Sequence, residues 1–80
     1  MGVKQAVVCR FQGICKERNM AYNELASVSG VTPSSVYSMM NPSRENVSIV
    51  LIKKLCDGLD MSLGEFFNAR EFDELEQEIR

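Results

Sequence analysis

Hydrophobic residues in this chain recur at three- and four-residue spacing, the period of an α-helix, along most of its length. Between residues 4 and 18 this spacing predicts an amphipathic first helix, with apolar positions at Val7, Val8, Phe11, Ile14 and Cys15. Gly13 lies inside this helix at a cost of about 1 kcal/mol relative to alanine. One interpretation is that Gly13 permits another helix to approach closely.

The middle of the chain predicts two short helices joined by a tight turn. The first runs from about Tyr22 to Ser29 and stops at Gly30, which takes the left-handed conformation that ends a helix at little cost. The second has Thr32 as its N-cap and Pro33 at its first position, and runs to about Met40. Two short helices cannot enclose a core alone, so the flanking segments must supply apolar surface and this pair must present something outward.

A polar loop over residues 41–46 separates the pair from a fourth helix. Ser48 is the expected cap of that helix, and its apolar stripe ends at Leu59. Ser62 then caps a short fifth helix over residues 63–67, with a glutamate at the capping-box position. With no strand pattern and no internal repeat, the sequence predicts an all-α fold, a compact five-helix bundle.

We assign the five-helix domain to residues 1–69 and an acidic extension to residues 70–80. In the extension Phe72, Leu75 and Ile79 fall at i, i+3 and i+7 among acidic residues. Three interpretations stay open: a sixth helix packed on its own domain, a helix packed on a second copy of the chain, or a frayed acidic tail.

The composition favours one soluble globular domain. Eighty residues are enough for a single small domain, and 45% apolar with 25% charged residues is ordinary for a folded protein. No apolar run approaches the roughly 20 residues that cross a bilayer, and no signal peptide precedes a cleavage site. We therefore expect a cytoplasmic protein with no membrane association.

Cysteine and histidine usage argues against metal sites and catalysis. Cys9, Cys15 and Cys56 form no C-x-x-C pair, and the chain has no histidine. We interpret all three cysteines as small buried hydrophobes in a reducing compartment. Without histidine, a glycine-rich phosphate loop or paired carboxylates in an apolar setting, we expect no cofactor, no metal and no enzyme activity.

Charge is unevenly distributed along the chain. Taken over the whole chain, the net charge of −2 is weak evidence against nucleic-acid binding, but the two halves of the chain differ. Residues 1–44 hold five basic and two acidic residues, whereas residues 45–80 hold four basic and nine acidic ones. The mildly basic half contains the predicted helix pair.

The order of these features resembles the lambda-repressor-like, Cro-type helix-turn-helix family, from about residue 11 to residue 67. The segments that carry the resemblance are Glu24-Leu25-Ala26, Ser29-Gly30-Val31-Thr32, Val36-Tyr37, Asn46-Val47-Ser48-Ile49, the run from Leu55 to Leu63, and Phe66-Phe67. Each segment alone is a weak signal, but their order and spacing are specific. The resemblance implies that the third helix enters the major groove of double-stranded DNA.

The resemblance also implies roles for single residues. The positions that match base-reading sites are Pro33, Ser34, Ser35, Tyr37 and Ser38. The positions that match phosphate contacts are Tyr22, Asn41 and Arg44, and the other cations nearest the expected surface are Arg10 and Lys16. Each serine taken singly could be merely solvated, but a cluster of hydroxyls on a face without acidic residues favours readout. Hydroxyls donate or accept at any base, so we expect modest direct readout.

Three positions depart from the family pattern. Tyr22 stands where glutamine is common, and Ala21 replaces the usual hydroxyl cap, which costs the helix about 1 kcal/mol. Cys15 and Met40 stand where many members pair an arginine with a glutamate. Because both partners are apolar here, no lone charge is buried.

These observations favour a sequence-specific transcriptional regulator, a repressor that occupies an operator. About three phosphate contacts per domain give a salt slope near −3. Such weak binding predicts a homodimer, joined through Phe72, Leu75 and Ile79. The alternative is a protein-interaction module, such as the antitoxin of a toxin–antitoxin pair, whose acidic C-terminus docks on a partner protein.

Overall fold

The computed structural model describes residues 1–79; the prediction for the extension also covers Arg80, which lies outside the described residues. Six helices follow one another along the chain: α1 (Val3–Glu17), α2 (Tyr22–Ser29), α3 (Pro33–Met40), α4 (Ile49–Gly58), α5 (Leu63–Phe67) and α6 (Arg70–Asp73). Residues 1–79 contain no strand, so the predicted all-α fold is confirmed. The first helix begins and ends one residue earlier than predicted.

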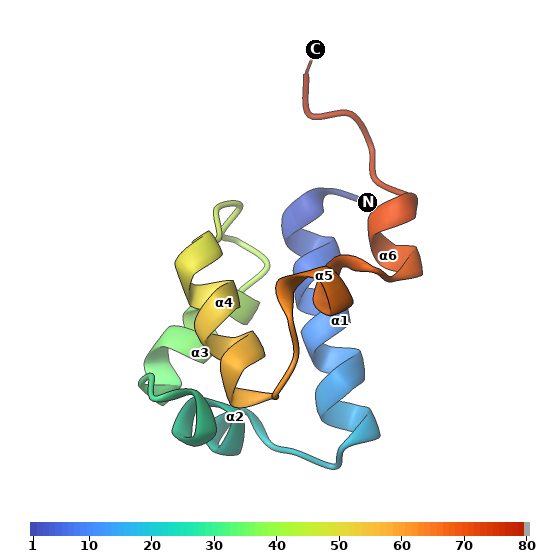
Figure 1. The fold of residues 1–80 in the computed structure, drawn as a ribbon. Coiled ribbons are helices and arrows are strands. Elements are labelled where there is room, and N and C mark those ends of the chain that lie inside the picture. The colour runs from blue at the N-terminus through green and yellow to red at the C-terminus, as the bar shows by residue number, and fades with distance from the viewer. Residues whose placement is uncertain (80) are drawn as a thin grey trace.

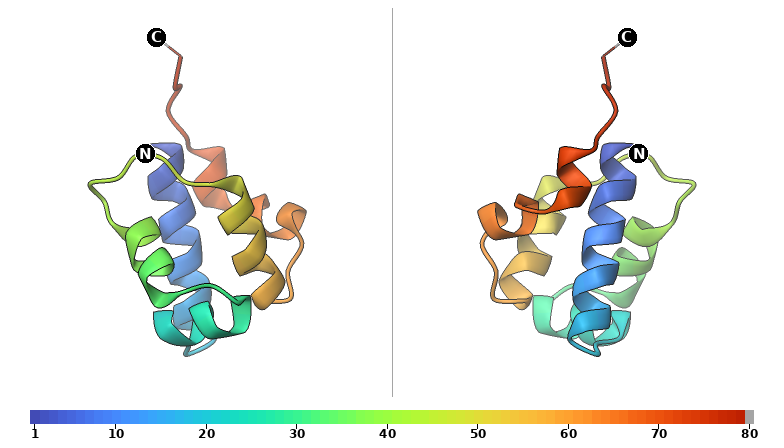
Figure 2. Two further views of the ribbon diagram at one scale, coloured as in Figure 1. Left: turned by 90° about the vertical axis from the view of Figure 1, so that its left-hand side faces the viewer. Right: turned by 90° about the vertical axis from the view of Figure 1, so that its right-hand side faces the viewer.

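Helix α1 is the longest, and in Figure 1 it stands beside α3 and α4, with α6 next to its first turns. Figure 2 shows α3 on one side of α1, α4 and α5 on the other side, and α2 across the end where α1 finishes. In this arrangement α2 packs against both α3 and α4, so the helix pair predicted from the sequence is held from two directions.

The core lies between α1 and the other helices. The rings of Phe11 and Phe66 are both fully buried, with centroids 4.4 Å apart. Leu25, Val36 and Leu55 are also completely buried and belong to the same cluster. Burying a side chain of this size stabilises a fold by about 1.5–3 kcal/mol. Cys15 and Met40 are buried in this cluster too, as expected for an apolar replacement of a charged pair.

Three helices end with a residue in the left-handed conformation. Gly30 after α2 has a φ of 69°, as predicted, but Asn19 after α1 and Asp60 after α4 have φ angles of 53° and 59°. At each end the next amide donates to a carbonyl five residues back, for example Met61 to Cys56 at 2.9 Å. The sequence indicated only the glycine because the other two residues adopt this conformation less readily.

The packing corrects the interpretation of Gly13. A methyl group at Gly13 would meet no atom within 4 Å, so this glycine does not mark a close helix contact. The close approach lies at Gly58, where a methyl group would come within 2.1 Å of the Ser29 hydroxyl oxygen. The same methyl group would lie 2.9 Å from the Cα of Ser29, so α2 and α4 meet at a tight contact. Among the described residues the Ser29 hydroxyl is buried and has no hydrogen-bond partner.

The cysteines are not all buried as predicted. Cys15 and Cys56 are buried, but Cys9 is half-buried. All three are free thiols. Burial raises the pKa of the Cys15 and Cys56 thiols, which favours their protonated, unreactive form.

The C-terminal extension combines two of the interpretations left open by its sequence. Helix α6 packs on α1, and its Phe72 ring lies 4.9 Å from Phe67 and 5.7 Å from Phe66 between centroids. The helix ends at Asp73, so Phe72, Leu75 and Ile79 do not form one helical stripe. After α6 the chain turns back to the N-terminus: the Glu76 amide donates to the carbonyl of Met1 at 3.1 Å, and Glu76 Oε1 accepts from the Met1 ammonium at 3.0 Å. The last described residues then point away from the helices (Figure 1), with Leu75 half-buried and Ile79 87% exposed.

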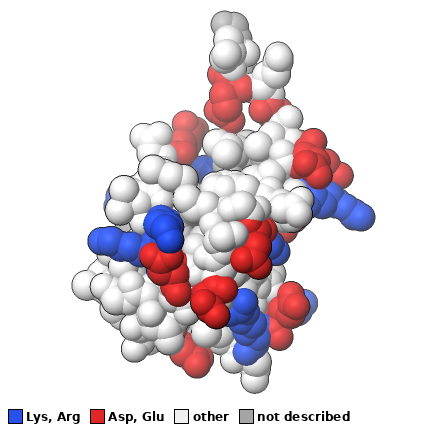
Figure 3. Space-filling view, in the orientation of Figure 1, with Lys and Arg blue, Asp and Glu red and all other residues white. Residues whose placement is uncertain are grey.

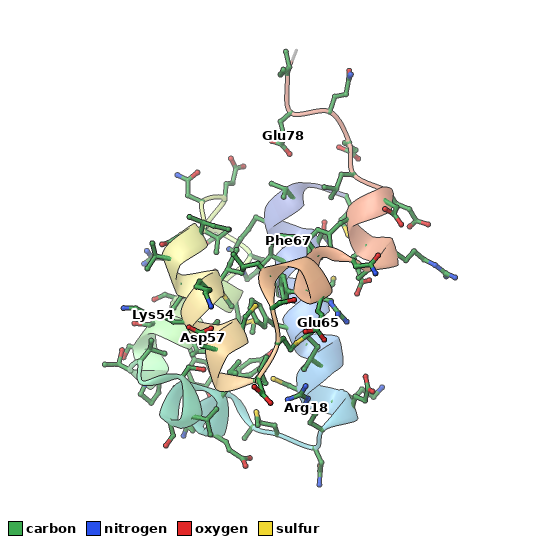
Figure 4. All side chains as sticks on the ribbon, in the orientation of Figure 1. Arg18, Lys54, Asp57, Glu65, Phe67 and Glu78 are labelled. Carbon is green, nitrogen blue, oxygen red and sulfur yellow. The ribbon has the colours of Figure 1, made fainter. Side chains whose placement is uncertain are left out.

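Cations on α1 hold the ends of other helices. Arg18 lies at the end of α1 (Figure 4), and its Nη1 donates to the carbonyl oxygen of Leu59 at 2.7 Å. Arg10 donates from Nε to the carbonyl of Phe66 at 2.9 Å and from Nη2 to the carbonyl of Glu65 at 3.1 Å. These carbonyls lie at the end of α4 and within α5, so the basic residues of α1 stabilise the fold.

Within residues 1–79 no helix is both long and apolar enough to span a bilayer.

Candidate nucleic-acid interface

The turn between α2 and α3 is closed by local hydrogen bonds. Gly30 is left-handed, and the amide of Val31 donates to the carbonyl of Ala26 at 3.1 Å. Thr32 then caps α3, since its Oγ1 accepts from the amide of Ser35 at 3.2 Å. The sequence signals for this turn are therefore confirmed, and they set the angle at which α3 leaves α2.

Helix α3 has a buried face and an outward face. Val36, Met39 and Met40 are buried in the core. The exposed residues are Pro33, Ser34, Tyr37 and Ser38, and Tyr37 is 53% exposed. Four of the five predicted base-reading residues therefore lie together on one uncharged, accessible surface.

Ser35 differs from the other serines of α3. It is half-buried, and its Oγ lies 3.0 Å from Oγ1 of Thr32. Its hydroxyl therefore takes part in the helix cap. A base contact by Ser35 stays a prediction that this geometry does not favour.

Two tyrosines connect α2 to the outward face of α3. The rings of Tyr22 and Tyr37 meet edge to face, with centroids 5.5 Å apart and an interplanar angle of 72°. Tyr22 is half-buried, and Ala21 before it provides no side-chain cap, as the sequence indicated. The ring of Tyr22 thus limits the positions open to Tyr37, in addition to any phosphate contact its hydroxyl makes.

A groove runs beside α3 toward the start of α4. Its walls come from α3 and from the segment that leads into α4, and its lining residues are Ser34, Ser35, Ser38, Met39, Arg44, Asn46, Val47, Ser48 and Leu51. The lining is rich in hydroxyl groups and contains one cation, Arg44, and no acidic residue. Three predicted base-reading serines and one predicted phosphate contact therefore border a single surface.

The loop after α3 carries two predicted phosphate contacts. Asn41 Oδ1 accepts from the amide of Ser43 at 3.0 Å and from its hydroxyl at 2.8 Å, so the side-chain oxygen of Asn41 shapes the turn. Arg44 is exposed, and within residues 1–79 its guanidinium takes part in no hydrogen bond or ion pair. Arg44 is therefore free to bind an anion.

The other two predicted cations lie elsewhere. The guanidinium of Arg10 donates to α5 and lies 5.8 Å from the centre of the Phe66 ring. Lys16 is exposed on α1 but does not line the groove. Phosphate roles for both stay predictions, and the geometry of Arg10 does not favour its role.

Charged side chains are concentrated away from the helix pair. Helix α3 has no charged residue and α2 has only Glu24, whereas α4, α5, α6 and the segment after α6 carry most of the acidic residues. Figure 3 shows acidic and basic side chains mixed over the face formed by α4, α5 and α6. An anionic backbone would therefore meet less repulsion at α2 and α3 than at the C-terminal half.

Sequence analysis missed three residues at this surface. Asn46 and Ser48 line the groove, although Ser48 was identified as a helix cap and its Oγ does accept from the amide of Leu51 at 3.2 Å. Lys4 contacts the loop from the start of α1. Asn46 and Ser48 lie in a segment that carries the family resemblance, and this was a signal that could have identified them. No sequence signal indicated Lys4, because its contact joins residues that are far apart in the chain.

The bundle, the closed turn and the outward face of α3 define a helix-turn-helix protein. A model of the family described as the Cro/C1-type HTH DNA-binding domain matches residues 10–71. The chain belongs to this family, and membership implies DNA binding. Comparisons with curated proteins and with solved structures give no match.

Proposed function

We propose that this protein is a sequence-specific transcriptional regulator that places α3 in the major groove and represses by occupying its operator. The observation that carries the proposal is the uncharged outward face of α3, which borders the groove containing Arg44. Hydroxyl groups donate to or accept from base edges, and a face without carboxylates does not repel phosphates. The family resemblance and the family match support the same orientation.

Base contacts and phosphate contacts come from different segments in this proposal. Ser34 and Ser38 meet base edges, and Tyr37 packs on a thymine methyl or a sugar. Tyr22, Asn41 and Arg44 bind phosphates, helped by the N-terminal ends of α2 and α4. With Arg10 bound to α5, Arg44 and Lys16 are the cations left for phosphates, and the salt slope per domain falls from about −3 to about −2.

A homodimer on a two-fold operator is part of the proposal, because one domain with so few cations binds DNA weakly. Phe72 packs inside the domain, so it does not take part as the sequence suggested. Leu75 and Ile79 are left as the apolar residues of a shared interface. Sedimentation that shows a monomer at high micromolar concentration would remove the dimer.

The test is selection of binding sites from a random duplex library at low salt. The selected site is then measured with Ser34→Ala, Ser38→Ala and Arg44→Ala. Arg44→Ala should weaken all sequences alike by about tenfold and flatten the salt slope by about 1. Each serine variant should relax the preference at one position and change affinity for other sequences little. If the wild-type chain enriches no site, the regulator proposal fails.

A second candidate is a protein-interaction module with secondary DNA binding. The C-terminal segment favours it, since it carries acidic side chains such as Glu78 (Figure 4) and exposes Ile79 beyond the contact of Glu76 with Met1. A variant that ends at Asp73 separates the two. The regulator proposal expects it to keep the half-site preference of the full chain, whereas the interaction module expects it to lose a partner that the full chain retains.

A further inference from the structure

Lys4 is the one charged residue that is buried within residues 1–79, with 8% of its surface exposed. It lies in the first turn of α1, and its Nζ donates to two backbone carbonyls far along the chain. The acceptors are the carbonyl oxygens of Asn41 at 3.1 Å and of Arg44 at 2.5 Å. A buried ammonium is costly unless its hydrogens are bound, so these two bonds account for its presence.

The contact also completes the end of α3. The last turn of α3 contains no basic residue, although a cation there interacts favourably with the helix dipole. Lys4 supplies this charge from α1, because Asn41 is the C-terminal cap of α3.

Lys4 joins both ends of a single turn. The amide of Arg44 donates to the carbonyl of Asn41 at 3.2 Å, which closes the turn over residues 41–44. All four of these residues are exposed, so little packing holds them. Within residues 1–79, Lys4 is the one side chain outside the loop that donates to its carbonyls. The direction in which Arg44 leaves the loop therefore depends on Lys4.

We propose that Lys4 is a positioning residue for DNA binding: it holds the 41–44 turn so that Arg44 meets a phosphate beside α3. The proposal rests on the proposed function. Lys4 makes no phosphate contact of its own in this proposal, because its ammonium is bound to the two loop carbonyls. It acts through Arg44, whose side chain lines the groove next to Ser34 and Ser38.

The experiment is a double-mutant cycle on the full chain with the selected duplex. Lys4→Met keeps most of the buried stem and removes the donors and the charge. It is combined with Arg44→Ala, and Lys53→Met serves as the control for loss of one positive charge, since Lys53 is exposed and paired with Asp57 on α4. Affinity is measured over a range of salt concentrations and corrected for the folded fraction.

The expected result is non-additivity. Lys4→Met alone should weaken binding about tenfold and flatten the salt slope by about 1, with the preferred bases unchanged. In the Arg44→Ala background the same change should have less than about a twofold effect, because the two residues act as a unit. Lys53→Met should leave the slope within about 0.3 of the wild-type value.

Hydrogen exchange of the Arg44 amide tests the contact without DNA. Lys4→Met, and Lys4→Gln if the methionine variant does not fold, should raise the exchange rate of this amide about tenfold or more while core amides stay protected. Additive effects in the cycle, or an unchanged Arg44 amide, would overturn the positioning role. If the wild type and Arg44→Ala behave as proposed but Lys4→Met binds like the wild type, this inference alone fails. Absence of any enriched site overturns it together with the proposed function.

Discussion

Helices α1 and α3 are both amphipathic, but they use their polar side chains in opposite ways. On α1 Lys4 and Arg10, and at its C-cap Arg18, each donate to the backbone of another segment. The exposed residues of α3 carry no charge, and its hydroxyls and tyrosine are left for a partner. Charge in the N-terminal half therefore mainly stabilises the fold, and neutral groups form the surface that we propose for DNA.

Most basic residues of the N-terminal half are engaged within the fold. Five basic residues in the first 44 suggested an electrostatic surface for phosphates. Three of them are bound to carbonyls within the domain, so proximity in the sequence overstated the charge available to DNA. Substitutions of the cations of α1 should therefore change the stability of the fold, and substitutions on the outward face of α3 should change DNA binding.

The largest expected effect lies in the supporting scaffold, at the contact of α2 with α4. Gly58→Ala should lower the free energy of unfolding by about 1–3 kcal/mol, because the new methyl group overpacks a filled space. It would lie 2.9 Å from the Cα of Ser29, an atom that cannot move without its helix. Urea unfolding followed by circular dichroism measures the change.

Gly13→Ala is the matched control for this substitution. A methyl group there meets no atom within 4 Å, so the helix should gain up to about 1 kcal/mol from propensity alone. Equal effects of the two substitutions would show that the tight contact does not limit the fold.

Arg10 and Arg44 give the most direct test of the comparison. Arg10→Met should lower the free energy of unfolding by about 1–2 kcal/mol, since two carbonyls lose their donors and a ring loses its cation. Its folded form should bind the selected duplex as the wild type does. Thermal unfolding and a binding titration below the transition measure the two effects.

Arg44→Ala should give the reverse pattern, with stability within about 0.5 kcal/mol of the wild type and weaker binding. The division between the helices fails if Arg10→Met weakens binding by the folded protein as much as Arg44→Ala does.

A smaller effect distinguishes the ring of Tyr22 from its hydroxyl. If the ring positions Tyr37, Tyr22→Phe should keep the base preference and lose only a phosphate contact, about 1 kcal/mol or fivefold. Tyr22→Ala should additionally relax the preference at the position next to Tyr37, because an edge-to-face pair is lost. Selection of sites with both variants measures this, and identical site preferences in the two would exclude a positioning role for the ring.

The smallest effect is the dependence of stability on alkaline pH. Burial raises the pKa of the Cys15 and Cys56 thiols above the ordinary value of 9.0, so the folded state favours their protonated form. The contribution of these two thiols to the free energy of unfolding is fully present below pH 9.0, and it is lost as the pH rises through their pKa values in the folded state. Urea unfolding of the wild type and of Cys15→Ala between pH 8 and pH 11 would show this, with a smaller loss in the variant; parallel curves would contradict it.

The helices and the turn could be predicted from the sequence, because they depend on local chemistry. Thr32 as a cap, Pro33 at the first position of α3 and Gly30 in a left-handed conformation act within a few residues of their own positions. The apolar period also assigned Phe11, Val36 and Leu55 to the core, as the structure confirms. The uncharged outward face of α3 follows from the same period.

The contacts of the cations could not be predicted in this way, because hydrogen bonds between residues 37 to 56 positions apart leave no trace in a local pattern and form only when the chain packs. The tertiary structure decided that Lys4 meets the loop after α3 and that Arg10 meets α5. It also moved the close helix contact from Gly13 to Gly58, since such a contact depends on which helices become neighbours. Local sequence therefore formed the surface of α3, and long-range packing determined which charges stand beside it.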